Sequence, residues 1–108
     1  MKLNTIIRVY DELNESQFAG LLYRPVFFGI RNNREYASYL YREDSFSVMF
    51  FNNDAIKGYW ARSIVYHEMT HQYLEEYLEV EEHDHHGPIF WKNYRKFAPK
   101  NVILFEGL

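Results

Sequence analysis

The spacing of apolar residues predicts that the chain begins with a helix. Across residues 4–22, apolar side chains recur at intervals of three or four positions, which is typical of one helical face. These apolar positions are Ile6, Ile7, Val9, Tyr10, Leu13, Phe18 and Leu21. Asn14 and Gly20 are points where this helix can be interrupted, and the helical pattern ends before Pro25, since the residue before a proline disfavours helical geometry.

Three short runs with strand character follow this helix. Residues 26–30 (VFFGI), 35–42 (EYASYLYR) and 46–52 (FSVMFFN) are rich in aromatic and β-branched side chains. The polar segments RNNR and REDS separate them, and turns this short favour antiparallel pairing of consecutive strands. We therefore expect a three-stranded antiparallel sheet arranged as a meander.

Two further helices are predicted after the strands. The first runs from residue 55 or 59 to residue 78, and the side chains of NND at 52–54 are available to cap it. Its expected buried residues are Trp60, Ile64, Val65, Tyr73, Leu74 and Leu78. After the polar loop EVEEHDHHG, Pro88 suits the first turn of a last helix that stops before Pro99. The apolar tail NVILFEGL is expected to dock as a short extra strand.

Length and composition fit one globular domain spanning residues 1–108 of the α+β class. The chain has no cysteine, which excludes disulfides, thiolate zinc ribbons and a cysteine nucleophile. The first residues turn polar too soon for a signal peptide. No apolar run reaches the roughly 18 residues that a membrane helix needs. We therefore expect a cytoplasmic protein without a membrane partner.

The stretch SIVYHEMTHQYLEEY carries the strongest chemical signal. His67 and His71 lie four residues apart, and on a helix this spacing puts both imidazoles on one face. One tetrahedral zinc ion accepts a nitrogen from each at about 2.0–2.1 Å. Glu68 lies about 100° further round the helix and can reach a water without itself binding the metal. This is the H-E-x-x-H arrangement, in which the glutamate is the general base.

A catalytic zinc site normally takes a third protein ligand and leaves one position for water. A histidine six residues after His71 is absent, because that position is Tyr77. The remaining candidates are Glu75, Glu76, Glu79, His83, His85 and His86. A glutamate one turn past His71 tends to point along the helix, so the histidines are favoured. Among them His86 precedes Gly87 and Pro88, where a helix start would fix its backbone and glycine would permit close approach.

At these residues the chain resembles the SprT-like zinc metallopeptidase domain, the family that includes the DNA–protein crosslink protease Spartan. The resemblance rests on HEMTH at 67–71 and on HGPIF at 86–90, which matches the family's H-G-x-x-F box. YDELNESQF at 10–18 is also similar to the family's first helix. The resemblance implies a minimal zincin-like fold without a zinc ribbon, whose C-terminal helix carries the third ligand at its start. It implies one zinc ion per chain, held by His67, His71 and His86, with Phe90 packed behind the third ligand.

The resemblance further implies a zinc-dependent metallopeptidase that acts on protein or peptide substrates, including DNA-associated proteins. Glu68 would be its catalytic residue, assisting attack by a zinc-bound water and protonating the leaving amine. Candidates for an additional oxyanion donor are Tyr66, Tyr73, His83 and His85. Two alternatives stay open: a non-catalytic zinc-stabilised binding module, and a nucleic-acid-associated adaptor that uses the last helix. The intact Glu68 argues against the first alternative, and the net charge of −3 argues against the second.

Charge is distributed unevenly along the second half of the chain. One decade is strongly acidic, with Glu75, Glu76, Glu79, Glu81, Glu82 and Asp84. We interpret it as solvated surface, with Asp84 also placed to orient a ligand imidazole. The basic residues that follow are Lys92, Arg95, Lys96 and Lys100. They predict either weak, salt-sensitive binding of single-stranded DNA or cations that satisfy a helix C-terminus.

Overall fold

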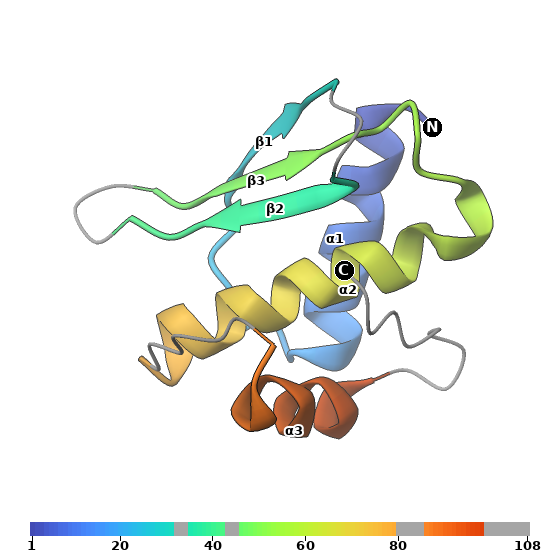
Figure 1. Cartoon of the computed structure of the whole chain (residues 1–108). Coiled ribbons are helices and arrows are strands. Elements are labelled where there is room, and N and C mark those ends of the chain that lie inside the picture. Colours follow the sequence, from blue (N-terminus) through green and yellow to red (C-terminus); the bar gives the residue numbers. More distant parts are fainter. Residues whose placement is uncertain (32–34, 43–45, 80–85, 99–108) are drawn as a thin grey trace.

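In the computed structural model, the first two α-helices cover one face of a three-stranded mixed sheet, and the third α-helix packs against the second on the side away from the sheet (Figure 1). The structure describes residues 1–31, 35–42, 46–79 and 86–98. The elements in chain order are α1 (Leu3–Gln17), β1 (Val26–Gly29), β2 (Ala37–Leu40), β3 (Val48–Phe51), α2 (Gly58–Gln72), a π-helical turn η1 (Tyr73–Tyr77) and α3 (Pro88–Phe97). The expected α+β class is confirmed, and the strand expected in the C-terminal tail lies outside the described residues.

Helix α1 buries Ile6, Tyr10 and Leu13, three of the apolar positions that predicted it. It ends earlier than residue 22, because the chain enters the left-handed region at Ala19 (φ 53°) and Gly20 (φ 72°). The amide of Gly20 donates to the carbonyl of Asn14 over 2.8 Å, which closes the helix end. A glycine adopts this backbone conformation without steric cost. Gly20 was therefore correctly named as a point of interruption.

The sheet is mixed, so the expected antiparallel meander is wrong. Its strand order is β1-β3-β2, with β1 parallel to β3 and β2 antiparallel to β3. Although β1 and β2 are consecutive in the chain, they lie at opposite edges of the sheet and do not pair with each other (Figure 1). The run Val-Met-Phe-Phe of β3 is the most apolar of the three, and three of its four residues are buried. A central strand is paired on both edges and is covered by helices on one face, and this explains why the most apolar run takes that place.

The register of the sheet separates a covered face from an open one. Phe27 and Met49 are register partners on the covered face; Phe27 meets the ring of Tyr10 from α1 at 5.1 Å between centroids, and Met49 is fully buried. The next register pair along these strands, Phe28 and Phe50, lies on the open face. Its two rings stack, and Phe28 is 49% exposed. No helix of the described residues lies over this second face (Figure 1).

Helix α2 begins without the expected capping by NND. Its N-cap position is Lys57, which makes no side-chain capping bond. Asn53 instead donates from Nδ2 to the backbone oxygen of Met1 over 3.1 Å, and so ties the turn before α2 to the start of α1. The carbonyl of Asn52 accepts the amides of Ala55 and Ile56. The polar run therefore builds a turn rather than a cap.

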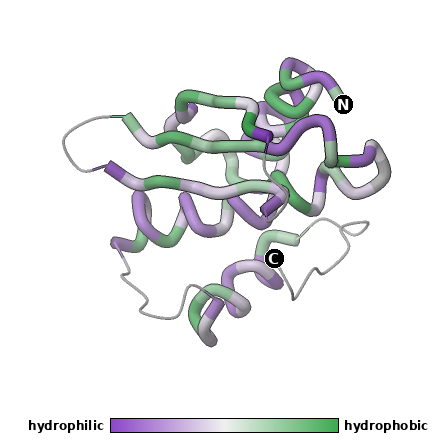
Figure 2. Tube along the Cα trace, turned by 45° about the horizontal axis from the view of Figure 1, so that its top comes forward, coloured by the Kyte–Doolittle hydropathy of each residue, from purple (hydrophilic) through white to green (hydrophobic). Residues whose placement is uncertain are grey.

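Helix α2 runs through the middle of the helical layer and is buried on almost every side. Every residue from 63 to 70 is buried. Figure 2 shows the apolar residues (green) concentrated in the central strand and mixed with polar ones (purple) along the helices. The helix continues into η1, so the predicted end near residue 78 is confirmed, although the last turn is π-helical. None of the helices in the described part of the chain is long and apolar enough to cross a membrane.

The end of α2 is fixed by a buried glutamine. Gln72 is fully buried, and its Oε1 accepts the hydroxyl of Tyr10 over 2.8 Å. Its Nε2 donates to the backbone oxygen of Tyr23 and to Glu76. Burying an amide is tolerable only when its hydrogen bonds are made. These bonds join α1, the loop after it and α2 at one point.

We expect Tyr10→Phe to lower the free energy of unfolding by about 1–3 kcal/mol, because Oε1 of Gln72 would then be buried without its donor. Urea denaturation measures this. Tyr23→Phe is the matched control, since the Tyr23 side chain is 83% exposed and only its backbone enters the network. The control should stay within about 0.5 kcal/mol of the parent. Equal losses in the two variants would contradict a role for the buried bond.

Candidate metal centre

His67 and His71 project from the same face of α2, as their spacing predicted. Their ring centroids are 5.0 Å apart. His67 is 1% exposed, and His71 is half-buried. The two imidazoles therefore lie at the border between the core and solvent, where a ligand can reach them from one side.

His86 comes to the same point from the segment before α3. Gly87 is the N-cap of α3 and Pro88 occupies its first turn, as expected for a helix start. His86 Nε2 lies 3.0 Å from His67 Nε2 and 3.3 Å from His71 Nε2. The predicted third ligand thus meets the other two histidines in space, although it is 15 residues from His71 in sequence.

The three nitrogens fit a single metal ion. All three ligand atoms lie within 4.8 Å of one another, and no other group of three such donors is found in the described residues. Two nitrogens bound to one tetrahedral ion at 2.0–2.1 Å are roughly 3.3 Å apart, close to the distances found here. An all-imidazole set suits zinc and several other first-row transition metals. Three imidazole nitrogens that converge on one point in this way can hold one metal ion.

The ring of Phe90 packs against the imidazole rings of all three histidines. Its ring centroid lies 4.9 Å from that of His67, 4.5 Å from His71 and 5.1 Å from His86. Phe90 is fully buried, one turn into α3. The expected packing behind the third ligand is confirmed, and Phe90 also contacts the two histidines of α2.

Burial keeps His67 neutral, the form that binds a metal. Desolvation is the main cause that lowers the pKa of His67 to about 3 from the usual imidazole value, and the neighbouring His71 and His86 contribute to this shift. Nδ1 of His67 is buried and has no hydrogen-bond partner among the described residues. A ligand imidazole usually donates from this second nitrogen. Asp84, expected to orient a ligand, lies outside the described residues.

Glu68 follows His67 on α2 and is 6% exposed. Burial raises the pKa of Glu68 to about 8, and the negative charge of Glu35 raises it as well. A carboxyl group in this setting exchanges its proton near neutral pH, which is what a general acid–base requires. A divalent ion on the adjacent histidines would favour the charged carboxylate and so oppose this rise.

The glutamates among the candidate ligands do not join the three histidines. Glu76 points toward the sheet, where its Oε1 accepts the hydroxyls of Tyr39 (3.0 Å) and Ser47 (2.8 Å). Glu79 is exposed and takes a left-handed backbone conformation (φ 54°). Glu75 is half-buried and is not a member of the metal-binding group. His83 and His85 lie outside the described residues.

Two of the candidate oxyanion donors belong to the core. Tyr66 is fully buried and donates its hydroxyl to the backbone oxygen of Tyr94, and burial raises its pKa. Tyr73 is 5% exposed and packs its ring against Phe18 and Phe97. Both tyrosines therefore hold α2 against its neighbours.

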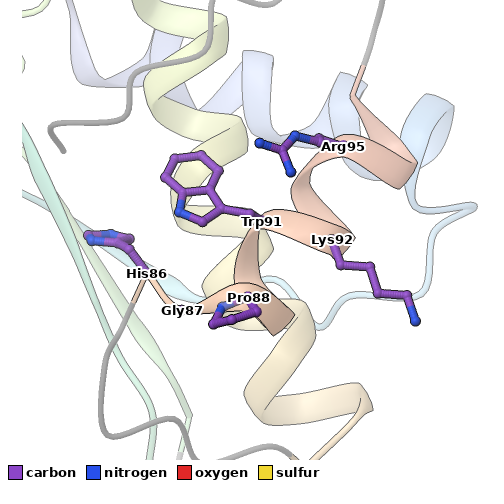
Figure 3. A pocket seen from close by; sticks show the side chains of 6 residues that line it. All are labelled: His86, Gly87, Pro88, Trp91, Lys92 and Arg95. Atoms are coloured by element: carbon purple, nitrogen blue, oxygen red, sulfur yellow. The ribbon is translucent and has the colours of Figure 1, made fainter.

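A pocket of about 620 Å³ adjoins the centre and shares His86 with it. It is lined by His86, Gly87, Pro88, Trp91, Lys92 and Arg95. In Figure 3 the indole of Trp91 stands between the His86 ring and the Arg95 guanidinium, while Lys92 points away from His86. Sequence reasoning named the two cations but missed Trp91. Trp91 could have been found from the sequence, because it lies four residues before Arg95 and this spacing puts both side chains on one side of a helix.

Comparisons with protein-family models, with curated proteins and with solved structures find no match to this chain. The resemblance to SprT-like metallopeptidases therefore rests on the motifs in the chain itself.

We expect one divalent metal ion to bind per chain, and His86→Ala to weaken its affinity at least a hundredfold. The reason is that His86 Nε2 is the atom nearest to both other ligands, and even residues that only orient a ligand are worth 10–100-fold. Titration of metal-free protein with zinc, followed by calorimetry, measures this. His83→Ala and His85→Ala are matched histidine controls. Loss of affinity in a control with full affinity in His86→Ala would show that the third ligand was wrongly assigned.

Removal of the metal should destabilise the fold, because the ion binds the native state and holds α2 to the start of α3. At a free metal concentration of a hundred times Kd, binding contributes about 2.7 kcal/mol. This corresponds to a Tm lower by roughly 10 °C after chelation. Differential scanning calorimetry with a chelator, and with metal restored in excess, gives the shift. An unchanged Tm after verified metal removal would contradict this expectation.

Proposed function

We propose that this chain is a zinc-dependent metallopeptidase that cleaves peptide bonds in proteins, of the kind that the SprT-like resemblance suggests. One observation carries the proposal: three histidine nitrogens converge within metal-binding distance, and a buried glutamate stands beside the first of them on the same helix. Three imidazole ligands with one position left open are typical of catalytic zinc. A purely structural zinc site is closed by four protein ligands.

A bound zinc ion would supply a Lewis acid that polarises the scissile carbonyl and acidifies water. His67, His71 and His86 would hold the ion, and Phe90 keeps their rings in place. Glu68 takes the proton of the attacking water and then delivers it to the leaving amine. Its position one residue after His67 keeps it near the reacting atoms without making it a ligand. The fixed rings and the buried carboxyl reduce the reorganisation that the reaction requires.

The last helix supports an association with nucleic acid only weakly. Lys92, Arg95 and Lys96 are exposed on α3, whereas Lys100 lies outside the described residues. Three cations against a net charge of −3 favour weak binding of single-stranded DNA that added salt would abolish. Cleavage of DNA-associated proteins would then depend on the substrate more than on a DNA site in this chain.

We expect Glu68→Gln to keep zinc and fold but to lose activity by about 10²–10⁴-fold, the usual contribution of general acid–base catalysis. His67→Ala should lose zinc and activity together. Both variants are compared with the parent for zinc content and for cleavage of an unfolded protein substrate. The contrast separates an enzyme from a zinc-stabilised binding module, in which function would follow metal content alone. Undiminished cleavage by zinc-loaded Glu68→Gln would refute the mechanism.

A further inference from the structure

The pocket beside His86 has a chemical character of its own. One wall is the half-buried indole of Trp91, which contacts the rings of Phe90 (5.0 Å) and Tyr94 (5.4 Å) and is thereby held in place. The exposed side chains of Lys92 and Arg95 add positive charge. Among the described residues that line the pocket, none is an aspartate or a glutamate. The pocket thus combines a fixed aromatic surface with two exposed cations.

These cations are available to a ligand. Within the described ranges, the salt bridges join Arg24 to Asp11, Arg31 to Asp54 and Arg62 to Glu12, and neither Lys92 nor Arg95 takes part in one. The Arg95 guanidinium lies beside the Trp91 ring, on the side away from His86 (Figure 3). A guanidinium presents a planar fork of donors that matches a carboxylate with two parallel hydrogen bonds.

We propose that this pocket is a specificity subsite that binds a carboxylate of the peptide substrate, borne within two residues of the scissile bond. The proposal rests on the proposed peptidase function and adds the substrate class. Arg95 would bind the carboxylate, and Trp91 would pack against the methylene groups of the residue that bears it.

The position of the pocket relative to the three histidines indicates how far the bound substrate residue would lie from the scissile bond. The His86 and Trp91 ring centroids are 6.3 Å apart, and His86 Nε2 also faces the other two ligands. An extended peptide advances about 3.3–3.6 Å per residue. A side chain resting on Trp91 therefore belongs to a residue one or two positions from the bond at the metal.

A single carboxylate fits this pocket better than a nucleic-acid strand does. A strand requires a basic track along several phosphates, whereas one guanidinium and one outlying lysine here serve a single anionic group. The carboxylate has two sources in peptides, an aspartate or glutamate side chain and a free C-terminus. Both present the same group, so the experiment must separate them.

The test uses zinc-loaded protein and internally quenched peptides with blocked ends and an otherwise neutral sequence. One glutamate is moved along the peptide, with glutamine at the same position as the isosteric control. A parallel set carries a free C-terminal carboxylate at increasing distance from the scissile bond. We expect KM about tenfold lower for glutamate than for glutamine at one or two positions next to the cleaved bond, with kcat nearly unchanged. A preference confined to the free C-terminal set identifies the terminus as the source.

Arg95→Glu and Lys96→Glu form a matched pair of charge reversals on α3. Lys96 is exposed but does not line the pocket, and its ammonium group lies over the ring of Phe97. Arg95→Glu should remove the preference for glutamate and favour lysine at the same position, with zinc content and Tm unchanged. Lys96→Glu should keep the parental preference. An equal change in the glutamate preference of both variants would show that the preference depends on overall charge. That result would overturn the subsite.

Equilibrium binding of the same peptides, measured by fluorescence anisotropy, separates failure of the subsite from failure of the peptidase. If no peptide is cleaved but glutamate peptides bind about tenfold more tightly and Arg95→Glu abolishes this, the subsite stands and the peptidase proposal fails. If cleavage occurs with no preference for a carboxylate at any position, the subsite fails and the peptidase stands. Absence of both cleavage and selective binding overturns the subsite. A single-stranded oligonucleotide that displaces the peptides and loses its own binding only in Arg95→Glu would make the pocket a phosphate site, which also overturns it.

Discussion

The structure depends on the contact between α2 and the start of α3, where Phe90 lies under three imidazole rings. His67 and His71 belong to one helix, so their spacing is set locally by the helical repeat. His86 belongs to another element, and its position depends on how α3 packs. Phe90 and Tyr94 provide that packing: both are fully buried, and the Tyr94 backbone oxygen accepts the hydroxyl of Tyr66 from α2. The third histidine is therefore placed by hydrophobic packing and by a hydrogen bond between helices.

This arrangement requires polar side chains inside a central helix, and most of them have structural partners. Thr70 donates its hydroxyl to the Tyr66 carbonyl one turn earlier (3.0 Å), and Gln72 is bonded to Tyr10 and to the Tyr23 backbone. His67 and Glu68 differ from these residues. Burial shifts the pKa of each toward its neutral form, downward for the histidine and upward for the glutamate, and the other charges that act on them are of like sign. Strongly shifted pKa values cluster at functional sites, and these two shifts support the proposed metal centre.

The sequence predicted what local spacing controls, and missed what depends on partners far away in the chain. The pair His67 and His71 follows from the helical period, and His86 was favoured because Gly87 and Pro88 mark a helix start. Strand positions were also found, but strand neighbours were not, because a short polar segment permits either a hairpin or a passage to the other edge. The contact of Phe90 with two rings of α2 involves a distance in space that no periodicity encodes. The bonds of Glu76 to Tyr39 and Ser47 were likewise inaccessible, since the π-helical turn changes the direction of side chains after Gln72.

The two sides of α3 have different roles at the candidate site. The buried side carries Phe90 and Tyr94 and sets the geometry of the ligands, whereas the outer side carries Trp91, Lys92 and Arg95 and borders the pocket. Trp91 links the two, because its ring touches both buried aromatic residues. If the pocket is the proposed subsite, changes at the exposed cations would alter which substrates bind without moving the three histidines. Changes at Phe90 would alter the metal centre itself. Under the proposed function, this helix of 10 residues could vary in specificity while the metal-binding residues stay fixed, because packing and recognition would use different residues of the same turns.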